Sequence, residues 1–402
     1  MIKRFIQDTL ALFIVIFILF LFGVCYTEED VQNSQLTVTQ DAIDISNPEM
    51  APSAPIEDLD FSDGTFGWTS GSASPYLLSP TFRYDGDNLV INTQRIGEYG
   101  WWQNDYVNFS EYWLAPESLL RAQFYVSTDQ TNIARVPNIR LFMRNVSAQL
   151  NFAYHINSYG PAYASPTQTP KMYEGFFVPH DNSFAPGYGL IYGIETANFN
   201  LAEPDSGEIY LSRVVLDRID SVPLVYSNTY DFQLGAWRYI SYPNFSAPKA
   251  TKTVSQLGLQ AINNFDTYGL FQGEGDSVPF EADGNGDPYI YRATFNVSTT
   301  LTNFSKVPMF RVSLKQICGR EEAILAVASI TGSGTAPDQV GKDYYVYIKP
   351  PGEEINMAPI GHRILVPTFE MLNVLSDDDP HGTIYLNSAK IDRISESDLP
   401  IF

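Results

Sequence analysis

The sequence predicts an all-β protein in which two tandem jelly-roll β-sandwich domains follow an N-terminal signal or anchor segment. This prediction rests on an internal duplication, on a two-residue alternation of apolar side chains that both copies share, and on closely spaced turn residues. After residue 26, no segment shows the sustained 3.6-residue period that would indicate a helix.

The duplication is most evident where residues 121–144 align without gaps to residues 292–315, with 11 of 24 positions identical. Nearer the end of each copy, residues 207–219 (GEIYLSRVVLDRI) match residues 382–394 (GTIYLNSAKIDRI). The same comparison pairs Tyr99 with Tyr268, Glu195 with Glu370, and Asp217 with Asp392. The chain therefore divides into a signal peptide or membrane anchor (1–27), a flexible linker (28–56), β-sandwich domain 1 (57–221) and β-sandwich domain 2 (222–402).

Each copy is predicted to consist of short strands. Ala122, Phe124 and Val126 alternate with polar or amphipathic residues, and the second copy keeps this pattern. A period of two indicates a strand with one buried face. Gly, Pro, Asn and Asp recur about every ten residues, a spacing typical of a sandwich or jelly roll.

The N-terminus has the features of an export signal. Lys3 and Arg4 precede an apolar run from residue 10 to residue 25. That run is longer than the apolar segment of a usual signal peptide and shorter than the roughly 20 residues that span a bilayer. A signal cleaved after Cys25, a retained anchor, and a lipoprotein acylated on Cys25 all remain open. In each case the folded part is expected to be exported, and to be secreted or held at the cell surface by this segment.

Composition excludes several classes of function. The chain carries 24 Lys and Arg against 46 Asp and Glu, a net charge of −22, which disfavours nucleic acid as a partner. Two cysteines cannot form a disulfide framework. The sequence contains no nucleophile elbow, zinc-protease motif or phosphate loop, and its four histidines are isolated. We therefore predict that the protein is not an enzyme.

Three groups of residues resemble the galactose-binding-like jelly rolls used by many carbohydrate-binding modules. They are an opening Phe61 with Gly67 and Trp68, a central YGWW at residues 99–102, and the closing strand that ends in Asp-Arg-Ile. The resemblance implies a β-sandwich and glycan binding. The family often has a calcium ion beside an acidic pair in the closing strand. Ser212-Arg213 and Asn387-Ser388 stand there instead, which puts that site in doubt.

Residues 152–163 differ most from their counterparts in the second copy. Tyr154, His155, Tyr159 and Tyr163 are the predicted ligand-binding residues, because aromatic rings can stack on a sugar while their polar ends reach its hydroxyls. The alternative is that these tyrosines have a packing role and fill the end of the sandwich. Further aromatic candidates are Trp101, Trp102 and Trp113.

Two other sets of polar residues are candidates. Asp283, Asn285 and Asp287 have the alternate spacing that begins a calcium loop, although Pro288 follows them and a simple turn is the alternative. Cations on strand faces could bind an acidic sugar or could pair internally, with Asp217 and Asp392 as partners. These cations are Arg121, Arg140 and Arg144 in the first copy and Arg292, Arg311 and Lys315 in the second.

The sequence thus favours an exported, non-catalytic cell-surface protein with tandem carbohydrate-binding-like domains, for glycan binding or adhesion. Its expected partners are extracellular glycans or cell-envelope components, and it would meet a membrane only through the N-terminal segment. A structural envelope component without a small ligand is the alternative, and an exported carbohydrate-active enzyme is a more distant one.

Overall fold

The computed structural model describes most of the chain from residue 57 to residue 395. The described residues are 57–72, 78–95, 97–104, 107–108, 119–132, 136–145, 150–156, 165–177, 189–197, 207–219, 229–232, 234–242, 245–261, 267–273, 277–302, 307–318, 321–330, 336–350, 364–373 and 382–395. For strand residues 107–108, 145, 150–156, 177, 189, 229–231, 316–318, 321–325, 329–330 and 373, only the backbone is described. The N-terminal segment and linker lie outside these ranges.

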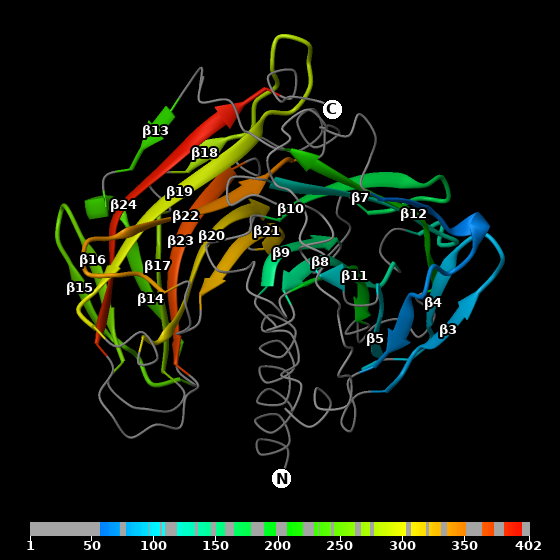
Figure 1. The fold of residues 1–402 in the computed structure, drawn as a ribbon, viewed down its shortest axis with the longest axis horizontal. Helices are drawn as coiled ribbons and strands as arrows, with labels where there is room; N and C mark the ends of the chain where they lie inside the picture. Colours follow the sequence, from blue (N-terminus) through cyan, green and yellow to red (C-terminus); the bar gives the residue numbers. More distant parts are fainter. Residues whose placement is uncertain are drawn as a thin grey trace, which may run out of the picture. The chain divides into compact units, whose positions relative to one another are not determined.

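The described part is a β protein, as predicted, with two short 3₁₀ turns, η2 (Phe61–Asp63) and η5 (Leu234–Ala236). Within it, no helix is long and apolar enough to cross a bilayer. The strands of the described residues lie in three antiparallel sheets (Figure 1).

The first sheet belongs to copy one and has the order β10-β7-β12-β4-β3, with β1 also pairing with β12. Its strands are β1 (Glu57–Asp60), β3 (Thr81–Tyr84), β4 (Leu89–Thr93), β7 (Leu119–Thr128), β10 (Lys171–Phe177) and β12 (Gly207–Ile219). The corresponding sheet of copy two has the equivalent order β22-β19-β24-β16-β15, with β13 on β24. Its strands are β13 (Thr229–Asp231), β15 (Lys249–Lys252), β16 (Leu257–Gln260), β19 (Ile290–Thr299), β22 (Lys342–Ile348) and β24 (Thr383–Ile394).

The remaining strands form one central sheet of twelve strands to which both copies contribute. Copy one supplies β2 (Thr69–Gly71), β5 (Tyr99–Gln103), β6 (Val107–Asn108), β8 (Asn138–Asn145), β9 (Leu150–Ile156) and β11 (Gly189–Ala197). Copy two supplies β14 (Arg238–Ser241), β17 (Thr267–Gln272), β18 (Val278–Pro279), β20 (Met309–Cys318), β21 (Glu321–Ile330) and β23 (Ile364–Asn373). The copies join where β9 pairs with β21.

The two copies have the same strand order, as the duplication predicts. The alternation in the sequence also becomes an identical burial pattern in β7 and β19. Both closing strands are interrupted by a register shift at the same place in the repeat, next to Ser212 in β12 and next to Asn387 in β24. The duplicated pattern therefore encodes the same sandwich twice.

The main hydrophobic core is one cluster that extends through both copies, and it includes side chains from the central sheet, from the first sheet and from the corresponding sheet of copy two. In copy one, Phe124 and Val126 of β7 are buried together with Ile139, Leu141 and Met143 of β8. In copy two, Phe295 and Val297 of β19 take the place of the first pair. Burial of such apolar side chains, each contributing roughly 1.5–3 kcal/mol, is the main force that holds the sheets together.

Candidate functional site

The candidate site is the face of the central sheet that points away from this hydrophobic core, which we call the outer face. In β8, Ile139, Leu141 and Met143 enter the core, so Arg140 and Arg144 must point to the opposite side. Phe142 alternates with them, and strand register extends the set to neighbouring strands. Its described residues include Tyr99, Trp101, Gln103, Arg140, Phe142, Arg144, Ile191, Gly193 and Glu195 in copy one, and Arg238, Tyr268, Leu270, Gln272, Arg311, Ser313, Lys315, Thr368 and Glu370 in copy two.

Aromatic rings lie at one side of the outer face in copy one. The rings of Tyr99 and Trp101 have centroids 5.7 Å apart and a 57° tilt. A Cβ atom on Gly71 would lie 2.6 Å from the Trp101 ring, so this ring packs directly on the backbone of β2. Trp102 points the other way: it is buried in the core, and its Nε1 donates to the Val90 carbonyl at 3.1 Å. Of these two tryptophan candidates, Trp101 is the one on the outer face, where its side chain is partly exposed.

Copy two has its own aromatic group beside Tyr268, which sequence reasoning did not identify. The ring centroid of Tyr268 lies 5.3 Å from that of Tyr242 and 5.5 Å from that of Phe245. Tyr242 is 44% exposed. The Tyr99/Tyr268 match in the repeat was a sequence signal for this position, but Tyr242 and Phe245 come from a loop outside the aligned segments.

A buried ion pair lies at the centre of the outer face in copy one. Arg140 Nη2 is 2.5 Å from a carboxylate oxygen of Glu195, and the two residues are direct partners across β8 and β11. Burial by itself would lower the pKa of Arg140, but Glu195 and Tyr99 together outweigh it and raise that pKa. Burial, reinforced by Glu195, also raises the pKa of Tyr99. Arg140 is therefore a fixed cation and Tyr99 a neutral hydrogen-bonding group.

Copy two repeats this cluster with a different second cation. Lys315 Nζ lies 3.2 Å from Glu370, and the Tyr268 hydroxyl donates to Glu370 at 3.1 Å. Arg311 is the direct partner of Glu370 across β20 and β23. Burial acts to raise the pKa of Glu370, but Lys315 and Arg311 together lower it. Glu370 is thus held as a carboxylate between two cations.

The predicted internal pairing of the duplicated arginines is confirmed on the first sheet and on the corresponding sheet of copy two. Arg121 binds Asp217 at 2.8 Å, and Arg292 binds Asp392 at 3.0 Å. On the outer face the partners are instead the glutamates that recur in the repeat, Glu195 and Glu370. The sequence match already contained these glutamates, but the strand register was needed to pair them with Arg140 and Arg311.

The four predicted ligand-binding residues are only partly placed. Register sets Tyr154 opposite Leu141 and His155 opposite Arg140. Because consecutive strand residues alternate between faces, Tyr154 and His155 belong to opposite faces of the central sheet. Their side chains, and all of Tyr159 and Tyr163, lie outside the described part, as does Trp113. Ligand binding by this group stays a prediction.

The predicted calcium loop is a closed turn. One carboxylate oxygen of Asp283 accepts from the backbone N–H groups of Asn285 (2.8 Å) and Asp287 (3.1 Å), and the other accepts from the Ser395 hydroxyl (2.6 Å). The described residues contain no group of three or more His, Cys, Asp and Glu side chains arranged to hold a metal ion. Calcium binding by Asp283, Asn285 and Asp287 stays a prediction.

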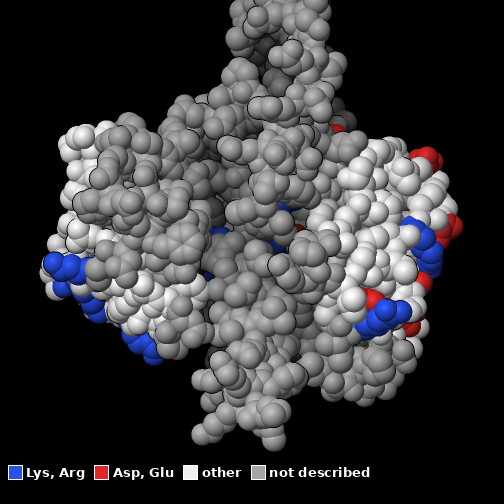
Figure 2. Space-filling model, turned by 90° about the horizontal axis from the view of Figure 1, so that it is seen from below, with Lys and Arg blue, Asp and Glu red and all other residues white. Residues whose placement is uncertain are grey.

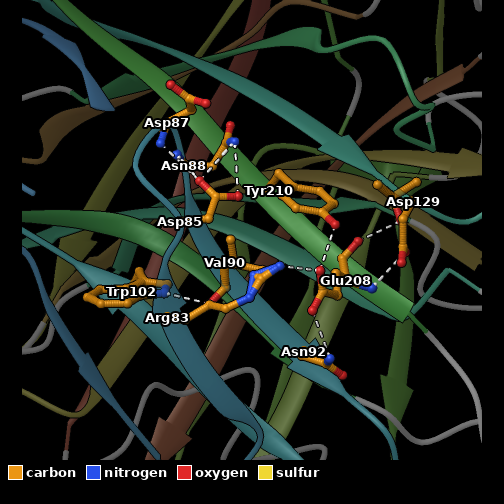
Figure 3. A network of polar contacts seen from close by, with 11 residues as sticks. Arg83, Asp85, Asp87, Asn88, Val90, Asn92, Trp102, Asp129, Glu208 and Tyr210 are labelled. Atoms are coloured by element: carbon orange, nitrogen blue, oxygen red, sulfur yellow. Dashed lines mark hydrogen bonds and ion pairs between the residues drawn. The ribbon is translucent and has the colours of Figure 1, made fainter. Parts of the chain in front are cut away.

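A second polar network, specific to copy one, surrounds Glu208 on β12 (Figure 3). One oxygen of its carboxylate accepts from Asn92 at 2.9 Å, and the other from Arg83 (2.5 Å) and Tyr210 (2.6 Å). Its backbone N–H donates to Asp129 at 2.8 Å. Because both carboxylate oxygens are engaged by side chains of β3, β4 and β12, this network ties the edge of the first sheet together.

Comparison with known proteins gives a likeness in fold. No protein-family model and no curated protein sequence matches the chain. The tandem CBM22-1–CBM22-2 domains of Paenibacillus barcinonensis Xyn10C align with 85% of this chain and 99% of theirs, at 12% identity and a TM-score of 0.27. A xylan-binding module, CBM15, aligns with 42% of this chain and 98% of its own, at 14% identity and a TM-score of 0.27.

The extracellular domain of ANXUR2 from Arabidopsis thaliana aligns with 83% of this chain and 90% of its own, at 9% identity and a TM-score of 0.23. The all-β architecture expected from the sequence is seen directly in the described sheets. At identities and TM-scores this low, the likeness assigns no ligand and no activity to this chain.

Proposed function

We propose that this protein is an exported, non-catalytic surface protein that binds glycan on the outer face of its central sheet. The observation that carries the proposal is the composition of that face in copy one. Trp101 is partly exposed and packs against the buried Tyr99, and Gln103 and Arg144, which are hydrogen-bonded to each other, supply polar groups on the same face. A stacking ring next to fixed polar groups is the combination that suits a sugar.

The described acids of this face support a binding role over catalysis. Glu195 and Glu370 are each held by ion pairs with neighbouring cations. A glycosidase needs one carboxylic acid that is protonated and a second carboxylate about 5–9.5 Å from it. The pairing with cations keeps Glu370 ionised, as its lowered pKa indicates. This is the opposite of what a general acid requires.

Export is the second part of the proposal. It rests on Lys3 and Arg4 before the apolar run of residues 10–25, and on the polar linker that follows. Fractionation of cells that express the full chain should recover it outside the cytoplasm. Recovery of most of the mature chain in the cytoplasm would contradict this.

A glycan array probed with the full-length protein tests binding. We expect weak, specific binding on the order of −4 kcal/mol, in the millimolar range, which Trp101→Ala abolishes. Phe66→Ala is the matched control, because Phe66 is a 47% exposed aromatic whose ring contacts the buried Phe61 edge-on, with centroids 6.0 Å apart. Tyr154→Ala and Tyr159→Ala test the earlier candidates in the same assay.

The outcomes separate the alternatives. Binding that is lost in Trp101→Ala and kept in Phe66→Ala supports the outer face as the binding surface. Loss in Tyr154→Ala or Tyr159→Ala with Trp101→Ala unaffected would move the site to residues 152–163. No binding to any glycan would favour the structural envelope component.

A further inference from the structure

The described side chains of the outer face carry a charge opposite to that of the whole chain. The chain has a net charge of −22. On the outer face, however, cations outnumber carboxylates among the described side chains, which are Arg140, Arg144 and Glu195 in copy one and Arg238, Arg311, Lys315 and Glu370 in copy two. Basic atoms are also visible in the middle of the molecule in Figure 2, apart from those at its two sides.

Arg144 is a buried cation of this face whose described hydrogen bond goes to a neutral group. It is 7% exposed, and its Nη2 donates to the neutral side-chain oxygen of Gln103 at 3.0 Å. Its guanidinium lies 5.2 Å from the centroid of the Phe142 ring, and its Nε is sealed from solvent without a hydrogen-bond partner. Among the described residues, no carboxylate lies within ion-pair distance of it.

The repeat shows that this position does not need an uncompensated charge for folding. Lys315 occupies the equivalent position in copy two, and it binds Glu370 at 3.2 Å. In copy one the equivalent glutamate, Glu195, is bound to Arg140 instead. Burial of a cation is unfavourable unless a counter-ion offsets it. Among the described residues, copy one thus retains an arginine bound to a neutral group where copy two has a lysine bound to a carboxylate.

The chemistry of Arg144 suits one class of ligand. A guanidinium presents a planar set of N–H donors that matches a carboxylate in a bidentate contact. Gln103, which holds Arg144, lies two residues from Trp101 on the same strand and face. An anionic group on a sugar that stacks on Trp101 would thus meet Arg144.

We propose that the outer face of copy one recognises acidic glycans, and that Arg144 binds the carboxylate of a uronic acid residue. This inference rests on the proposed glycan-binding function and specifies its substrate class. Electrostatic attraction to Arg144 makes the binding depend on salt concentration.

Binding of the full-length protein to polygalacturonate and to its carboxyl-reduced, neutral form tests the inference. We expect the acidic polymer to bind about ten- to a hundredfold more tightly, as one charge-assisted contact would give. Arg144→Gln should remove this preference, and Arg144→Lys should restore only part of it. Arg83→Gln is the matched control, because it removes one positive charge from the first sheet, and it should keep the preference.

A stability measurement distinguishes a ligand contact from a structural role. We expect the melting temperature of Arg144→Gln without ligand to equal or exceed that of the original protein, because an uncompensated buried charge is removed. A clear fall in melting temperature would overturn the inference and make Arg144 a structural group. A sulfated dextran serves as a third ligand, and a preference for it over polygalacturonate would overturn the assignment to a carboxylate.

The remaining outcomes separate the inference from the proposed function. Equal binding to both forms of the polymer, unchanged in Arg144→Gln, would overturn the carboxylate contact while leaving glycan binding in place. Binding to neither form, together with no binding on the glycan array, would overturn both.

Discussion

In copy one, Phe142 on β8 lies beside Gly193 on β11, whereas the equivalent positions of copy two hold Ser313 and Thr368. A Cβ atom on Gly193 would lie 3.0 Å from the Phe142 ring and would overlap the Trp102 carbonyl oxygen. In copy two, the Ser313 and Thr368 hydroxyls are hydrogen-bonded to each other. At these two neighbouring positions, copy one therefore has a phenylalanine beside a glycine, and copy two has a serine beside a threonine.

The comparison shows which positions of the duplicated outer face changed together. The tyrosine, arginine and glutamate of the buried cluster are the same in both copies. By contrast, Trp101 and Phe142 of copy one correspond to Leu270 and Ser313 of copy two. The scaffold is shared, while the aromatic surface beside Arg144 belongs to copy one.

The largest expected effect is loss of a glutamate from either buried cluster. Glu195→Gln leaves Arg140 buried without its counter-ion, and Glu370→Gln leaves two cations together. Removing one partner of a buried ion pair lowers the free energy of unfolding by about 3–5 kcal/mol, and Glu370→Gln should be the more harmful. Urea denaturation of the purified variants measures this. A loss below about 1 kcal/mol for both would show that the clusters behave as solvated pairs.

A smaller effect is expected from substitutions at Gly193 and at Thr368, its counterpart in copy two. Gly193→Ala places a methyl group against the Trp102 backbone, so we expect a loss of about 1–3 kcal/mol. Thr368→Gly should cost about 1 kcal/mol through backbone entropy and the lost hydroxyl contact. The added methyl group would overlap the Trp102 carbonyl oxygen, so Phe142→Ala should not restore the stability lost in Gly193→Ala. Rescue in the double variant would show that the ring alone excludes a side chain.

The pH dependence of stability provides a test specific to copy two. The pKa of Glu370 is lowered in the folded protein, so its contribution is present above the ordinary carboxyl pKa, about 4.3, and is lost as the pH falls through the folded value. Urea denaturation between pH 3 and pH 7 should show a smaller acid-induced loss for Glu370→Gln than for the original protein. Identical pH profiles would mean that Glu370 contributes nothing to acid sensitivity.

The sequence predicted the architecture well because its duplication and alternation are local patterns. The strands β7 and β19, and the pairing of Arg121 with Asp217, follow from matched segments with a period of two. The site was harder to predict, because the outer face assembles strands that are far apart in sequence. Gln103 and Arg144 meet only through the register of β5, β11 and β8, which no sequence spacing reveals.

The joining of the copies was also not predictable. The sequence indicated two successive sandwiches, and nothing in its repeats distinguishes separate sheets from a shared one. In the structure, Phe152, Ala153 and Tyr154 of β9 pair with residues of β21 to form the twelve-stranded sheet. Edge strands present unpaired backbone groups, so pairing two edges satisfies both.

The smallest expected effect concerns the network around Glu208, which copy two lacks because Thr383 occupies the equivalent position. Glu208→Thr gives copy one the residue of copy two and removes the contacts to Arg83, Asn92 and Tyr210. Arg83 is 45% exposed in this ion pair, so screening by solvent limits the expected loss to about 1 kcal/mol or less.

A spectroscopic titration of Tyr210 detects this change more directly than stability does. Burial, followed by the Glu208 carboxylate, raises the pKa of Tyr210 to about 12. The neutral phenol is therefore favoured in the folded state, and this contribution is complete below the ordinary pKa of about 10 and is lost as the pH rises through the folded value. In Glu208→Thr, the pKa of Tyr210 should fall toward its ordinary value without reaching it, because burial remains. Absorbance of the phenolate, compared with that of a Tyr210→Phe variant, isolates this group. An unchanged pKa would mean that burial alone sets it, and that the carboxylate is not coupled to the phenol.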